Sequence, residues 1–346
     1  MTLSADLMRG FADRTGLSAG SPERRYLWTD AFAVCNLLTL ERIDLALALI
    51  DRVHHVLGRH RDDDPRRGWI SGLSETEGQA HPTLGGLRIG KRLPERPIGH
   101  PIDERREWDR DGQYFHYLTK WTHALDQCAR VSRDEALSTW ARELAATAHR
   151  RFVYGAPRAR RMFWKMSIDL TRPQVASMGQ HDPLDGYVTC LQLGDSGLAT
   201  ATEDFRAMID PDALGTGDPL GIGGLLVDAS RLAQLERDPE LRLEILAAAR
   251  IGLHRYASQA DLEAPAEQRL AFRELGLAIG LAAFESDPDL ARYSRVRESI
   301  VEFWTEPSHR ESRTYRDHVD INDVMLATAL SPSGFIELAS RPGGTS

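Results

Sequence analysis

The sequence predicts an all-α protein, an (α/α)6 barrel of six helical hairpins, on the strength of three observations. Segments of helical length alternate along the chain between nearly all-apolar and amphipathic ones. A helix that is apolar on every side is buried on every side, so an amphipathic partner is needed to cover it. Two segments, HDPLDGYVTCL and GDPLGIGGLLV, repeat one another about 36 residues apart, which indicates stacked helical pairs. Because a closed ring buries such inner helices better than an open solenoid, we expect a single domain over residues 1–346.

The first two hairpins show the alternation clearly. A short helix over residues 4–15 precedes residues 24–40, which are apolar almost all round. Residues 43–57 then carry apolar side chains on one face only, which is typical of a half-exposed helix. The second hairpin repeats the pattern, with an aromatic-rich helix over residues 113–129 and an amphipathic one over residues 134–152.

Four more pairs complete the predicted ring. Asp182 and Asp218 suit the N-caps of their helices, and Pro183 and Pro219 suit the first helical position. Almost nothing is typical of a strand; the best candidate is residues 162–168. We expect the tail, residues 341–346, to be loose. The remaining helices are expected at residues 182–193 and 202–208, 218–235 and 240–256, 270–284 and 290–303, and 320–330 with a stub at 335–338.

Composition disfavours several classes of function. A formal net charge of −8 argues against a general nucleic-acid binder, which needs a basic face. No apolar run approaches the roughly twenty residues of a membrane span, and the N-terminus lacks the pattern of a signal peptide. Cys35, Cys128 and Cys190 are far apart in helical contexts, which fits buried thiols better than disulfides or a zinc site. We therefore expect a cytoplasmic protein with a small-molecule substrate, no membrane or nucleic-acid partner, and no metal or cofactor; the oligomeric state is left open.

The stretch from residue 58 to residue 112 interrupts the helical pattern. A connection of this length is far above the usual four to six residues, and such loops in compact domains are functional or disordered. This one carries Trp69, Trp108 and the apolar turns WISGL and TLGGLRI, whereas disordered segments are poor in such residues. We expect an ordered loop that covers one mouth of the barrel and forms part of the active site.

The candidate site residues share one property, their place near the starts of the inner helices or in the long loop. Inner helices that point the same way bring their N-termini together at one mouth, whatever their separation in sequence. The candidates for catalysis are Asp30, Asp109, Asp111, His116, His181 and Asp185; the candidates for substrate binding are Trp28, Trp69, Glu75, Arg88, Trp108, Gln113, Trp164 and Gln180.

These residue types fit carbohydrate chemistry. Aromatic faces cover the apolar side of a sugar, and charged groups make strong hydrogen bonds to its hydroxyls. Hydrolysis of a glycosidic bond generally needs two carboxyl groups, one protonated and one ionised. The leading hypothesis is therefore a glycoside hydrolase-type enzyme with paired carboxylates at the mouth.

Other interpretations remain open. A sugar epimerase or isomerase would use a positioned base, and His116, His181 or His318 could serve. An isoprenoid-type cyclase or a non-catalytic helical scaffold are further alternatives. Asp30 can be explained as a helix cap and His116 as a core histidine. The run of Asp62 to Asp64 is followed directly by a proline, so we expect it to face water rather than bind metal.

The opening of the first inner helix, Leu27 to Phe32 (LWTDAF), together with the alternating hairpins, resembles the six-hairpin glycosidase superfamily. That group includes unsaturated uronyl hydrolases, and the N-acylglucosamine epimerases and mannose isomerases are similar in architecture. The resemblance implies an (α/α)6 barrel and carbohydrate chemistry. It also implies Asp30 and one of Asp109 or Asp111 as acid/base groups.

Overall fold

The computed structural model describes residues 2–18 and 20–340, and almost all of their regular structure is helical. Seventeen α-helices are present in this part of the chain, whereas its five strands are two or three residues long. The chain divides into two compact units. Unit 1 comprises Met1–Pro22, Cys35–Glu41 and Asp210–Ala339, and unit 2 comprises Glu23–Val34 and Arg42–Ile209. The prediction of one domain over residues 1–346 therefore stays a prediction, and the expected loose tail, 341–346, lies outside the described residues.

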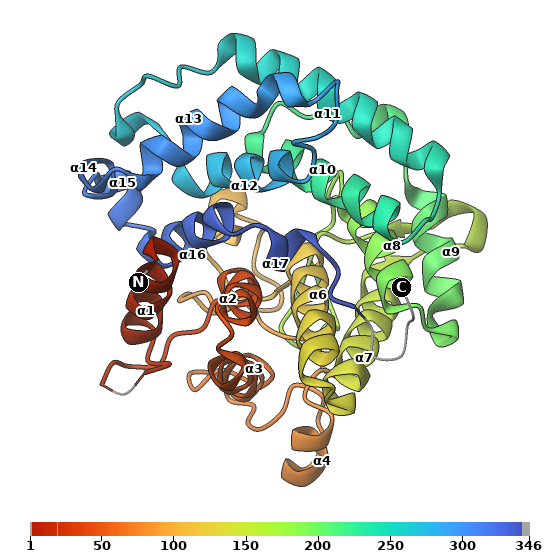
Figure 1. Cartoon of the computed structure of the whole chain (residues 1–346). Coiled ribbons are helices and arrows are strands. Elements are labelled where there is room, and N and C mark those ends of the chain that lie inside the picture. Colours follow the sequence, from red (N-terminus) through yellow and green to blue (C-terminus); the bar gives the residue numbers. More distant parts are fainter. Residues whose placement is uncertain (1, 19, 341–346) are drawn as a thin grey trace. The chain divides into compact units, whose positions relative to one another are not determined.

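Unit 2 contains the hairpins expected in the first half of the sequence (Figure 1). The apolar helix α2 begins in it and continues into unit 1. Helices α6 and α7 pack side by side, and α6 also contacts α3 and α8. The bounds are α2 (Leu27–Thr39), α3 (Ile43–Leu57), α6 (Phe115–Ser132), α7 (Glu135–Phe152), α8 (Asp182–Leu193) and α9 (Ala199–Met208).

Two helix starts that look alike in sequence differ in structure. Asp218 precedes α10 and accepts a hydrogen bond from the backbone N–H of Gly221 at 3.0 Å, as an N-cap should. At α8 the prediction was wrong by one residue, because His181 is the N-cap residue and Asp182 is already helical. No side-chain cap bond forms there, so the carboxyl group of Asp182 is not used for capping.

Unit 1 is held together by close helix contacts. Gly223 of α10 and Gly276 of α12 pack backbone to backbone, and a Cβ atom at Gly223 would lie 2.1 Å from the carbonyl oxygen of Gly276. Gly280, one turn further along α12, is equally close to Gly223. The bounds are α1 (Leu3–Arg14), α10 (Pro219–Gln234), α11 (Pro239–Gln259), α12 (Ala271–Ala282), α13 (Ser294–Thr305), α14 (Pro307–Arg310), α15 (Arg313–Arg316), α16 (Val319–Leu330) and α17 (Ser333–Ile336).

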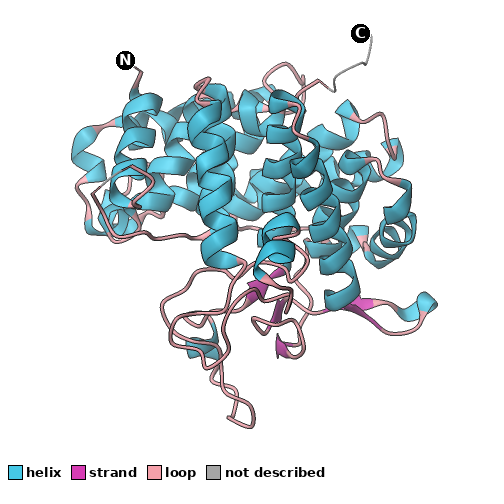
Figure 2. Ribbon diagram, turned by 90° about the horizontal axis from the view of Figure 1, so that it is seen from below, coloured by secondary structure: helices cyan, strands magenta, loops and turns pink. Residues whose placement is uncertain are grey.

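The long loop of unit 2 is ordered, as expected, and carries two short helices, α4 (Glu75–Ala80) and α5 (Glu104–Glu107). It leads into β1 (Gln113–Tyr114), which pairs antiparallel with β4 (Lys165–Met166); β4 in turn pairs with β5 (Pro173–Val175). The strands lie among the loops at one end of the helices (Figure 2). A second, two-stranded ladder joins β2 (Val153–Tyr154) to β3 (Arg161–Met162). The expected strand at 162–168 is thus realised as two fragments.

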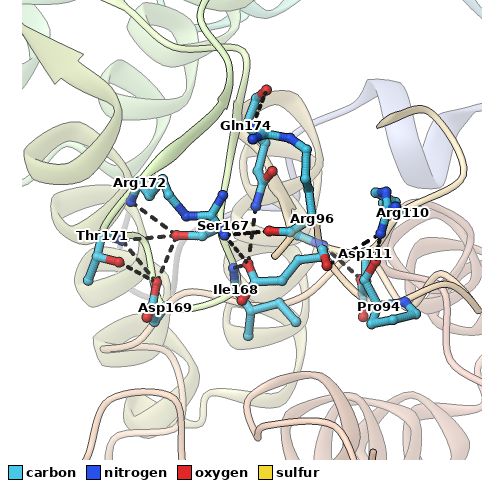
Figure 3. Close-up of polar contacts among 12 residues, drawn as sticks. Pro94, Arg96, Arg110, Asp111, Ser167, Ile168, Asp169, Thr171, Arg172 and Gln174 are labelled. Atoms are coloured by element: carbon cyan, nitrogen blue, oxygen red, sulfur yellow. Dashed lines mark hydrogen bonds and ion pairs between the residues drawn. The ribbon is translucent and has the colours of Figure 1, made fainter. Parts of the chain in front are cut away.

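Hydrogen bonds fix the loop to the segment around β4 and β5 (Figure 3). Arg172 donates to the carbonyl oxygen of Arg96 at 2.7 Å, while Arg110 donates to that of Pro94 within the loop itself. Glu95 accepts from the backbone N–H of Ile168 at 2.8 Å. These contacts give the loop a defined position on unit 2.

Candidate functional site

Aromatic rings gather at the starts of α2, α6 and α8 in unit 2, and we call this group the aromatic cluster. The His116 ring lies at its centre. It stacks on Tyr114 with ring centroids 5.4 Å apart, and it meets Trp28 edge to face at 6.1 Å. Trp164 lies parallel to it at 6.3 Å. The members of the cluster are Tyr26, Trp28, Trp108, Tyr114, His116, Tyr117 and Trp164.

His116 faces Asp182 from the first turn of α6. The imidazole Nδ1 lies 3.5 Å from a carboxylate oxygen of Asp182, but no hydrogen bond is aligned between them. Within the described part of the chain, His116 Nδ1, Asp182 Oδ2 and the indole N–H of Trp28 are buried without a hydrogen-bond partner. Buried polar atoms are nearly always paired, so these three unpaired ones make the cluster and its Asp182 neighbour a candidate binding site.

A second charged pair lies one helical turn deeper. Lys120, four residues after His116, donates to Asp185 at 2.7 Å, and both side chains are largely buried. Residues three or four apart on a helix share a face, so the His116–Asp182 and Lys120–Asp185 pairs form successive rungs between α6 and α8. The Lys120 ammonium fixes the position of the Asp185 carboxylate.

The polar contacts between α6 and α8 continue below these rungs. His123 contacts the side-chain oxygen of Gln192 at 3.0 Å, and Gln192 donates to Asp126 at 2.6 Å. Arg130 closes the row by donating to Asp126 at 2.8 Å. The face of α6 that carries these residues is therefore a buried polar seam rather than a solvated stripe.

Two lysines approach the Tyr114 ring. Lys165 Nζ lies 5.3 Å from the ring centroid and donates to the carbonyl oxygens of Glu107 and Arg110, at 2.5 and 2.8 Å. Burial lowers the pKa of Lys165 to about 8. Lys91 Nζ lies 5.6 Å from the same centroid, and burial lowers its pKa as well, opposed by the carboxylates of Asp109 and Asp111.

The tyrosines of the cluster are hydrogen-bond donors at neutral pH. Tyr26 and Tyr117 share a hydrogen bond between their hydroxyls at 2.8 Å. Burial raises the pKa of Tyr26, Tyr114 and Tyr117 above that of a free tyrosine. A protonated phenol can donate a hydrogen bond to a hydroxyl group of a bound ligand.

Two of the predicted residues, Asp111 and Arg88, are part of the packing of the loop. The Asp111 carboxylate is fully buried and accepts from Arg88 at 2.7 Å and from Arg61 at 3.2 Å. It also accepts the backbone N–H groups of Gly90, Lys91 and Gly112. Arg88 in turn donates to the carbonyl oxygens of Val56 and Arg59. The geometry gives both residues a structural role, and nothing in it supports the predicted roles in catalysis and binding.

Asp30 and Gln113 are likewise occupied by their surroundings. Asp30 is buried and accepts from Arg25 at 3.2 Å and from the backbone N–H of Tyr26 at 2.8 Å. The Gln113 amide bridges three backbone groups, accepting from Leu87 and donating to Gly85 and Ile168. These contacts position Tyr26 and Tyr114, so Asp30 and Gln113 support the cluster without being members of it.

Trp69 and Glu75 lie in another part of the loop. Trp69 is buried under α4, with the guanidinium of Arg59 4.5 Å above its ring. Glu75 is exposed on α4 and pairs with Arg59. Trp140 of α7 holds this segment by donating to the carbonyl oxygen of Ala80 at 2.8 Å. Neither Trp69 nor Glu75 contacts the aromatic cluster.

The other predicted residues lie near the cluster. Trp108 is half exposed and meets Trp164 edge to face at 4.6 Å. Asp109 is exposed beside Lys91. Gln180 is exposed and His181 partly buried, in the turn that leads into α8.

Sequence reasoning missed several residues of this site. Asp182 was assigned to capping, although its place after a turn and before Pro183 is what points it at His116. Lys120 was noticed only as part of a polar row. Lys165 carries no motif that could have identified it, because its place beside Tyr114 depends on the pairing of β1 with β4.

The described residues contain no group of three or more His, Cys, Asp or Glu side chains arranged to hold a metal ion. Asp63 and Asp64 are bound by arginines instead, Asp63 by Arg61 and Asp64 by Arg66. In the same part of the chain, no helix has the length and apolar character needed to cross a membrane. The three cysteines are buried, and none of them forms a disulfide in the described part of the chain.

A surface cavity of about 560 Å³ lies on α11 in unit 1. Its one lining carboxylate, Asp289, is paired with Arg250 at 2.6 Å. Arginine side chains and His254 make up most of the remaining polar wall. It offers no carboxylate pair, so the aromatic cluster of unit 2 is the better candidate for chemistry.

Comparison with known proteins identifies the fold. No protein-family profile and no curated protein sequence matches the chain. Among solved structures, it is similar to a GH76 α-mannanase from Bacteroides thetaiotaomicron, with a TM-score of 0.58 and 8% identity over 96% of this chain and 95% of that one. The prediction of an all-α, (α/α)6-barrel fold is confirmed.

Proposed function

We propose that the chain is a carbohydrate-active enzyme of the glycoside hydrolase type, with its active site at the aromatic cluster of unit 2. The observation that supports this most strongly is the His116–Asp182 pair, buried among aromatic rings with polar atoms left unpaired. Aromatic faces and protonated tyrosines suit a sugar ring and its hydroxyls. The fold shared with a mannanase is consistent with the same class of chemistry.

Asp182 and Asp185 are the carboxyl pair that the geometry favours. They lie three residues apart in the first turn of α8, where side chains are about 5–6 Å apart at Cβ. Glycoside hydrolysis generally needs two carboxyl groups that flank the scissile bond. Asp182, with an unpaired oxygen and His116 beside it, is suited to exchanging a proton with the leaving group. Asp185, fixed by Lys120, is suited to stabilising the positive charge that develops on the sugar.

A sugar epimerase or isomerase is the second candidate, and the central position of His116 favours it. An imidazole next to a carboxylate is a suitable base for removing a proton from carbon beside a carbonyl group. In this case His116 would act as the base, and Asp182 would orient it.

The test compares His116→Gln, Asp182→Asn and Asp185→Asn with the wild type on a panel of oligosaccharides and reducing sugars. Release of reducing ends, lowered at least a hundredfold in both aspartate variants, would support hydrolysis. Exchange of solvent deuterium into a sugar, abolished in His116→Gln, would support the epimerase. The control is Asp62→Asn, which removes an exposed loop carboxylate and should keep full activity. Full activity in all three site variants would exclude this site.

A further inference from the structure

The side chain of Lys91 is the feature of the cluster that neither mechanism above uses. Its ammonium lies over the Tyr114 ring, which stacks on His116. Within the described part of the chain, this ammonium makes no hydrogen bond and no ion pair. The ammonium is partly desolvated, and the carboxylates that act on it, those of Asp109 and Asp111, form no ion pair with it, so an anion placed beside it would stabilise its charged form.

The backbone holds Lys91 in a fixed position. Its N–H donates to Asp111 at 3.3 Å, and its carbonyl oxygen accepts from Arg61 at 2.6 Å. Gly90, with φ of +93°, makes the preceding turn, and a Cβ atom there would lie 2.2 Å from the carbonyl oxygen of Arg25. The constrained backbone therefore fixes the point from which the Lys91 side chain extends toward the Tyr114 ring.

The two neighbouring cations, Lys165 and Arg110, both bind backbone carbonyl oxygens. Lys165 is fully buried and donates hydrogen bonds to the carbonyl oxygens of Glu107 and Arg110. Arg110 donates to the carbonyl oxygen of Pro94. A phosphate, with nearly two negative charges and three oxygens, is generally held by several donors or by an arginine fork. A single carboxylate matches a single ammonium.

We propose that Lys91 makes the site selective for a sugar that carries one carboxylate. The inference rests on the proposed function, because it takes the aromatic cluster as the place where a sugar binds. Lys91 then pairs with the carboxylate while the rings of the cluster cover the sugar face. Asp109, exposed and close enough to act on Lys91, competes with the ligand for the same charge.

The test measures binding of three matched pairs, glucose and glucuronate, galactose and galacturonate, and mannose and mannuronate, with glucose 6-phosphate as a further arm. Titrations follow tryptophan fluorescence at low ionic strength. In the wild type we expect at least one acidic sugar to bind about tenfold or more tightly than its neutral partner. Lys91→Gln should abolish that preference and Lys91→Arg should keep it. Arg92→Gln makes the same charge change at the adjacent, exposed residue and should also keep it.

Asp109→Asn should tighten binding of the acidic sugar, because it removes the competing carboxylate. Equal binding of acidic and neutral sugars, a preference that survives in folded Lys91→Gln, or tighter binding of the phosphate would each overturn the proposal and leave the proposed function standing. Failure of every sugar to bind the folded wild type would overturn both. An unchanged thermal midpoint in Lys91→Gln establishes that any loss of binding is local.

Discussion

Asp111 accepts five hydrogen bonds from its own protein, two from the side chains of Arg61 and Arg88 and three from backbone N–H groups. A carboxylate so surrounded has no lone pair left for a substrate. Asp182, in contrast, is also buried but keeps an oxygen without a partner. Both residues are aspartates near a helix start in the sequence, and only their partners in space distinguish the structural one from the candidate for catalysis.

Asp111→Asn should therefore change stability more than chemistry. Removing one partner of a buried ion pair leaves the other charge, that of Arg88, uncompensated, at a cost of about 3 kcal/mol or more. We expect the free energy of unfolding in urea to fall by about that amount. Asp109→Asn, two residues away and exposed, should change it by less than about 0.5 kcal/mol. A variant as stable as the wild type but devoid of activity would assign Asp111 to the chemistry instead.

The buried ring of His54 should make the stability of the protein depend on pH. Its ring is buried between Trp121 and Trp140, and its Nε2 accepts from the indole N–H of Trp121 at 3.1 Å. Burial lowers the pKa of His54 to about 3. Between pH 6.5 and 3 the unfolded chain binds a proton that the folded chain does not. Stability is therefore lost as the pH falls through this window, by roughly 1.4 kcal/mol per unit.

His54→Gln isolates this effect, because glutamine can still accept from Trp121 but does not titrate. Urea unfolding at pH 7, 6, 5 and 4 should show a shallower loss of stability for the variant than for the wild type. Parallel curves for the two proteins would show that other groups govern the acid transition.

At the scale of the elements, the sequence predicted most of the helices and few of the contacts. Helix α3 begins and ends where its apolar face predicts, and the loop of residues 58–112 is ordered, as its tryptophans indicated. The pairing of β1 with β4 could not be predicted, because two-residue strands carry no periodic pattern. Yet this pairing brings Trp164 and Lys165 to Tyr114. Half of the candidate site therefore depends on contacts that local sequence does not encode.

At the crossing of α10 and α12, alanine substitution of two adjacent glycines should change the stability in opposite directions. In Gly223→Ala the new methyl group would meet the carbonyl oxygen of Gly276, so we expect a loss of about 1–3 kcal/mol or more. At Gly224 a Cβ atom would meet nothing within 4 Å, and alanine there should stabilise the helix by about 0.5–1 kcal/mol. Thermal unfolding of the two variants measures the difference. A stabilised Gly223→Ala would contradict the close packing.

At the scale of the whole molecule, one helix belongs to both units. Residues 27–34 of α2 lie in unit 2, and residues 35–39 lie in unit 1. Helices form cooperatively, because each added residue depends on the turn before it. Unfolding of either unit should therefore unravel α2 and weaken the other.

Gly223→Ala, a substitution expected to destabilise unit 1, tests this coupling. Of the seven tryptophans only Trp304 lies in unit 1, so tryptophan fluorescence reports mainly on unit 2. We expect the fluorescence midpoint in urea to shift as far as the midpoint of far-UV circular dichroism, as a single cooperative domain requires. A fluorescence midpoint that stays at the wild-type value would establish two independently folding domains.

The native cysteines are buried and should not interfere with site-specific labelling of an introduced cysteine. Burial raises the pKa of both Cys128 and Cys190 to about 12, and Cys35 is fully enclosed, so none should react with a maleimide while the protein is folded. Ile98, at the tip of the long loop, is 84% exposed. A cysteine placed there would be the single reactive thiol of the native protein, and a spin label on it would test whether that loop changes position when a sugar is added.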